Sequence, residues 1–469
     1  MALWENLRPS LQPAWMGLGA LWVCLTAVPI MCARLLGRAC CPALRLNVRG
    51  RAILITGANT GIGFESALAL FRGGATVVLG CRNAAKARVA QQRIEAARLD
   101  PAGRVLVVPL NLASFASVRA CAAAILTAKD TAGNAVYPPL DSIVLNAGRN
   151  GRAGASVDGC HELYQTNYLG HFLLLQLLLP SVLRHAAAHD AAVDTAACDT
   201  TAAPLCAEGA LQDLERELLR GGARARRAAL QSAGHSARIV CVGSVMHHWG
   251  QRDASRSALY HVEGGASALG GAAAPVGSWE PNAYCDSKLH LILLAAAIER
   301  RCASRGVRGV SVNPGAVASD IWRDSWPAWF VPVWRLIMGL LFLTPRQGAA
   351  TTLAALTAPL PDAPPLLAEA EERLGVGGAD GAAASPPPNA SRCAHYFVPY
   401  WLPLQSALCP CAGVRYVDPL QWLPFESLGM FAGARLVRPN LRGADAAEAG
   451  AELWAQSDDL VRRFTKKQD

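Results

Sequence analysis

Tyr284 and Lys288 are two residues whose chemistry and spacing could support proton transfer. They stand four positions apart, immediately before the apolar run Leu289 to Ile298, and in a helix this spacing puts both side chains on one face. An ammonium group beside a phenol stabilises the phenolate, which lowers the tyrosine pKa and allows proton exchange near neutral pH. The alternative is a surface lysine beside a half-buried tyrosine, so the pair becomes informative only together with the elements that would position it.

A glycine-rich turn near the start of the chain is a second feature with chemical potential. The apolar segment 52–55 predicts a short strand, an amphipathic helix is expected through Phe71, and between them lie Gly57, Gly61 and Gly63. Such a turn lets backbone amides and a helix N-terminus face a pyrophosphate. The spacing is GxxxGxG rather than GxGxxG, and a glycine-rich turn without a ligand is the alternative.

Arg82 follows the next predicted strand, residues 76–80, at the point where an NAD-selective site would carry an acidic residue. A cation there suits a 2′-phosphate, so NADP(H) is favoured over NAD(H), and an ordinary solvated arginine is the alternative. Further strands are predicted at 105–109 and 141–145, the second followed by an Asn-Ala-Gly sequence (146–148). These elements predict an α/β fold, doubly wound around a mainly parallel sheet.

Composition narrows the class of protein. The chain has 469 residues, 52% of them apolar, and a formal net charge of +9 that is spread over separate arginine groups. The sequence has no zinc-finger spacing and no basic stretch interleaved with aromatics, so nucleic acid is not an expected partner. The 15 cysteines are odd in number and scattered, which argues for a reducing compartment rather than a disulfide framework. No metal site is expected, because Cys409 and Cys411 lack a second pair at ligand spacing.

The N-terminal segment predicts a membrane anchor helix. Residues 14–33 carry no charge and are long enough to cross a bilayer. A cleaved signal peptide is the alternative, but the residues before Ala33 suit a cleavage site poorly. The residues that precede the span are also nearly neutral, whereas a signal peptide begins with a positively charged region. Arg34 and Arg38 follow the span, so we expect residues 1–38 to anchor a single-pass protein whose remainder faces the cytosol. The expected membrane is that of the endoplasmic reticulum.

Seven motifs occur in an order that resembles the short-chain dehydrogenase/reductase family, and most closely its retinol-dehydrogenase-like branch. They are TGANTGIG at 56–63, CR at 81–82, NAG at 146–148, TNYLGHFLL at 166–174, RIVCVGS at 238–244, YCDSK at 284–288 and NPGAVASDI at 313–321. The resemblance covers residues 50–358 and implies a Rossmann-fold catalytic domain over that range. It also implies hydride transfer with a nicotinamide cofactor.

The resemblance assigns roles to four catalytic residues. Tyr284 would be the general acid/base, Lys288 would hold the nicotinamide ribose, and Ser244, ending the fifth strand, would hydrogen-bond the substrate oxygen. Asn167 would support a water chain from Lys288 to bulk solvent, and a plain structural role is its rival, because a buried Asn in an apolar helix needs partners in any case. The implied cofactor site consists of Thr56, Gly57, Asn59, Thr60, Gly61, Ile62, Gly63, Arg82, Asn111, Leu112, Asn146, Ala147, Gly148, Tyr284, Lys288, Pro314, Gly315, Val317 and Ser319.

Two site positions depart from the family pattern. Asn111 stands where the family usually has an Asp that touches the adenine, and its amide oxygen can still accept a hydrogen bond. Ser319 stands where the family often has Thr, which keeps the hydroxyl. His247 and His248 follow Ser244 and are interpreted as residues of a substrate loop rather than metal ligands.

Four further segments extend the predicted domain. Residues 186–236 are interpreted as an external insertion, and the Pro-, Ala- and Gly-rich residues 359–394 as a linker or insert. The apolar segment 326–343 predicts a substrate-covering lid, with simple core packing as the alternative. Residues 395–469 form a C-terminal extension that is expected to complete or flank the substrate pocket, and its aromatic part could instead lie on the membrane surface.

Together these features predict an NADP(H)-dependent oxidoreductase that interconverts a lipophilic alcohol and its carbonyl, such as a retinoid, a steroid or another lipid. The lid and the anchor motivate the lipophilic substrate. The anchor would contact the membrane, and whether the lid at 326–343 also does so stays open. Two alternatives stay open: a general carbonyl-detoxifying reductase with the same site, and a catalytically silent, membrane-tethered NADP-binding scaffold. Assembly into a homo-oligomer also stays open.

Overall fold

The computed structural model describes most of the predicted catalytic domain and parts of the C-terminal extension. The described residues are 46–196, 237–254, 281–322, 331–360, 395–400, 431–437 and 446–466, apart from positions 47, 152 and 359. The predicted anchor (1–38) therefore lies outside the described residues, as does most of the linker 359–394.

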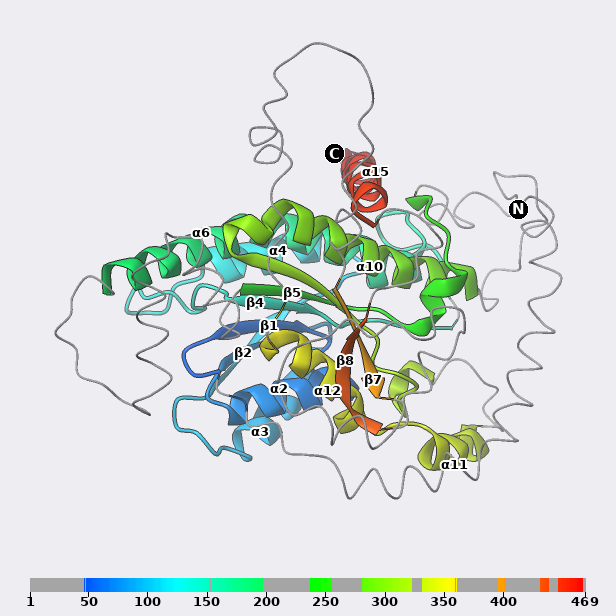
Figure 1. Ribbon diagram of the computed structural model, residues 1–469, viewed down its shortest axis with the longest axis horizontal. Helices are drawn as coiled ribbons and strands as arrows, with labels where there is room; N and C mark the ends of the chain where they lie inside the picture. Colours follow the sequence, from blue (N-terminus) through cyan, green and yellow to red (C-terminus); the bar gives the residue numbers. More distant parts are fainter. Residues whose placement is uncertain are drawn as a thin grey trace, which may run out of the picture.

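An eight-stranded sheet organises the fold, with the strand order β3-β2-β1-β4-β5-β6-β7-β8 (Figure 1). All neighbouring strands pair in parallel except β7 and β8, which are antiparallel. The prediction of a doubly wound, mainly parallel sheet is therefore confirmed. The strands are β1 (Ala52–Thr56), β2 (Thr76–Cys81), β3 (Arg104–Pro109), β4 (Ser142–Leu145), β5 (Ala237–Val242), β6 (Val307–Val312), β7 (His395–Tyr400) and β8 (Phe431–Val437).

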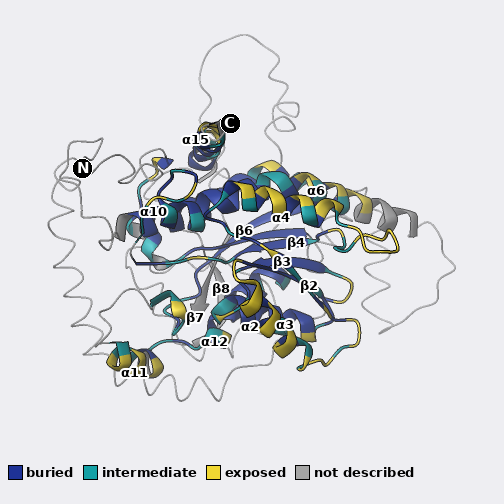
Figure 2. Cartoon of the chain, turned by 180° about the vertical axis from the view of Figure 1, so that it is seen from behind, coloured by how far each residue is buried: buried dark blue, intermediate teal, exposed yellow. Residues whose placement is uncertain are grey.

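Helices cover both faces of the sheet, which explains why its central strands are apolar almost throughout (Figure 2). Every residue of β1, β4, β5 and β6 is buried. One face packs against α2 (Gly61–Arg72), α3 (Ala84–Glu95) and α12 (Pro345–Thr357). The other face packs against α4 (Phe115–Thr127), α6 (Gly170–Ala196) and α10 (Pro281–Cys302), with α15 (Ala446–Lys466) on the outside of α10.

Short elements at the sheet edges complete the described fold. They are α5 (Glu162–Tyr164), the π-helix η1 (Gln165–Leu169), the 3₁₀ helices η2 (Val245–Trp249), η3 (Ala303–Arg305) and η4 (Asp320–Trp322), and α11 (Val331–Leu341). Local sequence explains several boundaries. Asn83 caps α3 by accepting from the Lys86 amide at 2.9 Å, and Thr344 and Gln347 form a reciprocal capping box at the start of α12.

The C-terminal extension contributes to the main sheet and to a helical layer. β7 pairs with β6, although a long stretch of chain separates them, and β8 pairs with β7. On α15, the Ser457 hydroxyl lies 2.8 Å from the Tyr168 hydroxyl, and the Trp454 and Phe172 rings are 5.1 Å apart. The division of the chain into a catalytic domain and an extension stays a prediction, because elements from both share one sheet.

The segment 186–236 begins as a continuation of a core helix. α6 runs on to Ala196, and residues 197–236 lie outside the described part of the chain. Within the described residues, the stretch Glu162–Ala188 is the one helix long and apolar enough to cross a membrane, and 72% of its most apolar window is buried inside the fold. It is therefore a core helix in this structure.

Candidate active site

The predicted site residues gather at the carboxyl ends of the four central strands. The glycine-rich turn follows β1, residues 146–148 follow β4, Ser244 follows β5, and Pro314 follows β6. Because β1, β4, β5 and β6 are consecutive neighbours in a parallel sheet, these four connections meet at one edge.

The glycine-rich turn packs so closely against residues 146–148 that Gly57 and Gly63 have no room for a side chain. Gly57 has φ +68°, and a Cβ there would lie 2.8 Å from the Ala147 Cα. A Cβ on Gly63 would lie 2.5 Å from the Asn146 Nδ2. Thr60 is the N-cap of α2 but makes no side-chain capping bond, and the first turn carries no acidic residue. The N-terminus of α2 is therefore suited to an anion such as a pyrophosphate.

Thr56 fixes the turn against the end of β4. Its Oγ1 accepts the backbone amides of Asn146 and Ala147, both at 2.9 Å, and the Asn146 side-chain amide donates to the Thr56 carbonyl at 2.8 Å. The Asn146 side chain is thus hydrogen-bonded to the backbone of the turn, so the surface of the turn consists of small groups. This arrangement lets a ribose or ring approach closely.

Arg82 follows β2 and Asn111 follows β3, on the side of the sheet away from Ser244 and Pro314. Arg82 is exposed and makes no hydrogen bond or ion pair with any residue that the structure describes. The Asn111 Oδ1 accepts from the Ala113 amide at 3.2 Å, so one of its acceptor positions is already used. Leu112 is buried, and its carbonyl lies only 2.3 Å from where a Cβ on Gly170 would be.

Tyr284 and Lys288 lie in the first turns of α10, as their spacing predicts. The Lys288 Nζ is 5.7 Å from the centroid of the Tyr284 ring and donates to the Val242 carbonyl at 2.8 Å. Both residues are buried: Lys288 is 3% exposed and Tyr284 is 8% exposed. A Cβ on Gly148 would lie 3.5 Å from the same Nζ, so the lysine reaches the end of β4.

The protonation of this pair reflects its burial. Burial raises the pKa of Tyr284 to about 12, and a hydrogen bond from the Ser244 side chain acts in the opposite direction. Burial also lowers the pKa of Lys288 to about 8. The net direction of the Tyr284 shift is therefore upward, because the loss of hydration on burial is its largest cause. A lowering of the tyrosine pKa by Lys288 stays a prediction.

Ser244 lies beyond the fifth strand rather than at its end. β5 ends at Val242, and Ser244 is the N-cap of η2, where its Oγ accepts from the Met246 amide at 3.3 Å. The Ser244 side chain also interacts with the Tyr284 phenol, and this interaction lowers the tyrosine pKa. His247 is buried and its Nδ1 donates to the Ser244 carbonyl at 2.7 Å, which steadies this turn.

Asn167 lies in the π-helical turn η1, a widened turn that is frequent at functional sites. Its Oδ1 accepts from the Arg149 amide at 2.8 Å, and its Nδ2 donates to the Arg149 carbonyl at 3.0 Å and to the Ser287 Oγ at 3.2 Å. These contacts support the structural role. The Asn167 Oδ1 and the Lys288 Nζ each lie 3.5 Å from a Cβ built on Gly148, so both side chains border the end of the connection after β4.

The connection after β6 closes the other side of the site. Gly315 has φ +79°, which sets the turn after Pro314. A Cβ on Gly348 would lie 2.6 Å from Val317 and 3.4 Å from Ile62, so this connection touches the start of α2. Ser319 is 3.7 Å from a Cβ built on Gly61.

His171 is a site residue that sequence reasoning missed. It is fully buried, its Nε2 lies 2.8 Å from the Thr56 Oγ1 and its Nδ1 lies 2.9 Å from the Asn167 carbonyl. Because the carbonyl can only accept, Nδ1 carries the proton and Nε2 accepts from the threonine hydroxyl. Burial lowers the pKa of His171 to about 4, which keeps this neutral form. Its spacing of four from Asn167 on an apolar helix was the available signal.

The residues present fit a nicotinamide dinucleotide. A Cβ at Gly57 or Gly63 would disrupt the close packing of the glycine-rich turn. The N-terminus of α2, which has no side-chain cap, begins directly after this turn. Backbone amides there would hold the pyrophosphate, and Lys288 would hold the ribose beside the nicotinamide.

Comparisons with known proteins agree with this arrangement. The family model described as short chain dehydrogenase matches residues 51–195. Dehydrogenase/reductase SDR family member 13 from Homo sapiens is 31% identical over 314 residues, which are 66% of this chain and 62% of that relative. Retinol dehydrogenase 11 from Homo sapiens is 28% identical over 313 residues, which are 66% of this chain and 73% of the relative.

A solved structure of a short-chain type dehydrogenase/reductase from Mycobacterium marinum covers 67% of this chain and 92% of its own, with 19% identity and a TM-score of 0.40. The chain thus spans less than two thirds of the length of the first relative named above. The ordered motifs and the two curated relatives point the same way: the chain is similar to the short-chain dehydrogenase/reductase family and, within it, to retinol dehydrogenases.

Proposed function

We propose that this protein is an NADP(H)-dependent oxidoreductase that interconverts a lipophilic alcohol and its carbonyl, with Tyr284 as the general acid/base. The observation that carries the proposal is the hydrogen bond between Ser244 and the Tyr284 phenol, with the Lys288 ammonium 5.7 Å from the same ring. A buried phenol that interacts with a hydroxyl and lies near a cation is positioned to donate its proton to a bound substrate. The similarity to short-chain dehydrogenases and retinol dehydrogenases supports the same chemistry.

The chain's own residues would divide the work as follows. A bound nicotinamide would supply or accept the hydride. In reduction Tyr284 gives its phenolic proton to the substrate oxygen, and in oxidation it takes that proton back. Ser244 donates to the same oxygen and steadies its developing charge. Lys288 holds the ribose and keeps a positive charge beside the phenol.

The preference for NADP(H) depends on Arg82. Its guanidinium is exposed beyond the end of β2 and has no ion-pair partner among the described residues, so it is available to a 2′-phosphate. Arg82→Asp is expected to weaken NADPH binding at least tenfold more than NADH binding, measured by fluorescence titration. Arg88→Asp, at an exposed arginine of α3, is the matched control. An equal loss for both cofactors would remove the 2′-phosphate assignment.

The lipophilic substrate class is supported by the apolar surface near the end of β6. Trp322, Trp334 and Phe342 form a cluster with ring centroids 5.6–6.0 Å apart, and the Trp322 Nε1 donates to the Val317 carbonyl at 3.0 Å. The outer face of α11 exposes Val333 at 49% and Leu336 at 65%, and α11 stands apart from the main body (Figures 1 and 2). An aromatic cluster beside the nicotinamide side of the site suits an apolar substrate.

The test is nicotinamide absorbance with the full chain, NADPH or NADH, and a panel of retinoid, steroid and short aldehydes. Tyr284→Phe runs beside the natural protein. Turnover that the substitution abolishes is the expected result, and the best panel member begins to identify the substrate. Faster turnover of the short aldehydes would favour a detoxifying reductase. Tight NADPH binding without turnover of any member would favour a scaffold, and no cofactor binding in folded protein would refute the proposal.

A further inference from the structure

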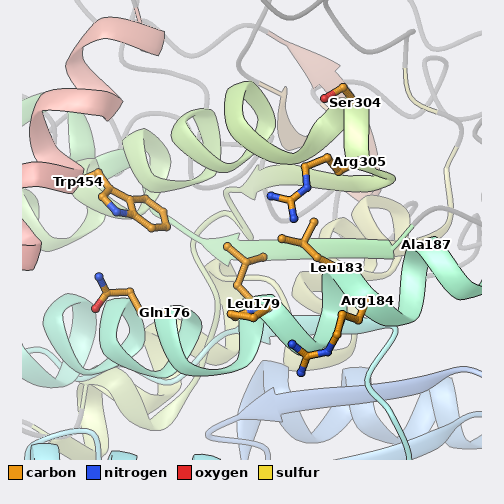
Figure 3. Close-up of a pocket in the computed structure, with 9 residues that line it drawn as sticks. Gln176, Leu179, Leu183, Arg184, Ala187, Ser304, Arg305 and Trp454 are labelled. Atoms are coloured by element: carbon orange, nitrogen blue, oxygen red, sulfur yellow. The ribbon is translucent and has the colours of Figure 1, made fainter.

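A hollow of about 710 Å³ lies between α6, η3 and α15, and none of the residues discussed as catalytic lines it (Figure 3). This size is within the range of sites that bind small molecules. The lining residues, here called the α6–α15 groove, are Gln176, Leu179, Pro180, Leu183, Arg184, Ala187, Ser304, Arg305 and Trp454.

The groove is at the end of the sheet opposite the candidate active site. η3 ends at Arg305, two residues before β6 begins, and the C-terminal half of α6 lies at the same end. The catalytic residues follow the carboxyl ends of the strands instead. A molecule in the groove would therefore leave the nicotinamide site open.

The floor of the groove is apolar. Leu179 and Leu183 lie side by side on α6, each 8% exposed, and the Trp454 ring forms the end contributed by α15. The ring is fixed by an edge contact with Phe172, with centroids 5.1 Å apart. A firm apolar floor of this kind suits an alkyl chain.

The walls of the groove are positively charged. Arg184 and Arg305 are exposed, flank the two leucines in Figure 3, and make no hydrogen bond or ion pair with the residues that the structure describes. The Arg301 guanidinium lies 4.3 Å from the Trp454 ring centroid and adds a third cation beside the lining. Among the lining residues that the structure describes, none is acidic. The nearby carboxylate of Asp458 is already bonded to Gln176 and Arg462.

We propose that the α6–α15 groove binds a lipophilic carboxylate, with its alkyl chain on Leu179, Leu183 and Trp454 and its carboxylate between Arg184 and Arg305. Planar guanidinium groups match carboxylates with two parallel hydrogen bonds, which a cationic or neutral head group cannot form. The proposal does not depend on the proposed catalytic function.

The test titrates decanoate, kept below its micelle concentration, into the full chain in nanodiscs of zwitterionic lipid, with heat measured by calorimetry. Empty nanodiscs correct for partition into lipid, and decyltrimethylammonium is the probe of matched length and opposite charge. Decanoate should bind at least tenfold more tightly than this cation. Arg184→Gln with Arg305→Gln should weaken decanoate binding by about tenfold or more, because hydrogen bonds to charged groups are lost.

Two controls locate the site. Arg88→Gln removes an exposed arginine of α3 on the other face of the sheet and should leave decanoate binding unchanged. Tyr284→Phe should also leave it unchanged, which separates the groove from the candidate active site. Equal binding of the two probes, or unchanged decanoate binding in the double variant, would overturn the proposal. Binding of the full chain to anionic vesicles, without any binding of free decanoate, would also overturn the proposal.

Discussion

Replacing Ser244 by alanine tests how the site controls the protonation of Tyr284. Burial alone would hold the tyrosine in its neutral form, and the Ser244 hydrogen bond opposes that effect. A hydrogen bond to a charged group contributes about 1.5–3 kcal/mol. Because about 1.4 kcal/mol corresponds to a tenfold change, Ser244→Ala should reduce the phenolate fraction at a given pH by about 10- to 150-fold.

The assay is the pH dependence of kcat/KM in the oxidative direction, which requires the phenolate. The whole profile of Ser244→Ala should move to higher pH and fall by the same factor at neutral pH. Ser244→Thr keeps an oxygen at this position and should recover most of the activity. NADPH binding should not change, since Ser244 does not line the dinucleotide turn.

The same substitution removes the cap of η2, which costs about 1 kcal/mol of stability, and this effect is separable. Thermal unfolding at pH 7 measures it independently of turnover. An oxidative profile of Ser244→Ala that superimposes on that of the natural protein would refute the reasoning. A loss of activity explained entirely by unfolding would do the same.

Three further predictions follow from the geometry. Gly57→Ala forces a Cβ to 2.8 Å from the Ala147 Cα at φ +68°, so we expect NADPH binding to fall below detection or the protein to unfold, which titration and circular dichroism would separate. Burial lowers the pKa of His171 and of His290 to about 4, so the unfolded state binds more protons between pH 6.5 and 4. The free energy of unfolding should fall as pH decreases through that window, by about 3 kcal/mol for each histidine. Denaturant unfolding at several pH values measures it, and a free energy that does not change with pH would contradict this prediction. The oxidative rate should rise about tenfold per pH unit up to about pH 8, where the buried Lys288 loses its proton, and a rate independent of pH would contradict the assignment of Tyr284.

Local sequence patterns predicted most of the sheet and the glycine-rich turn after its first strand. The strand predicted at 52–55 is β1, and the turn after it has the positive φ angles that Gly57 and Gly61 provide. Such features depend on neighbouring residues, so periodicity and glycine spacing reveal them. The sequence also placed Tyr284 and Lys288 on one helix.

Features that depend on distant parts of the chain were not predictable in this way. The pairing of β7 with β6 joins segments separated by residues 313–394, and no local pattern specifies it. The contact between His171 and Thr56 joins α6 to the end of β1 for the same reason. The extent of burial around Tyr284 also depends on tertiary packing, which is why the upward direction of its pKa shift was not predictable from the sequence.

Burial changes what the Tyr284–Lys288 pair can do at neutral pH. Because burial raises the pKa of Tyr284 to about 12, the side chain is almost entirely a neutral phenol at pH 7. Lys288, with a pKa of about 8, is still largely protonated at that pH. The pair therefore rests as a neutral phenol beside an ammonium group, which is the form that donates a proton to a carbonyl oxygen. Reduction can start from this resting state, whereas oxidation must first remove the phenolic proton, and only contacts that favour the phenolate, such as the Ser244 hydrogen bond, lower that cost.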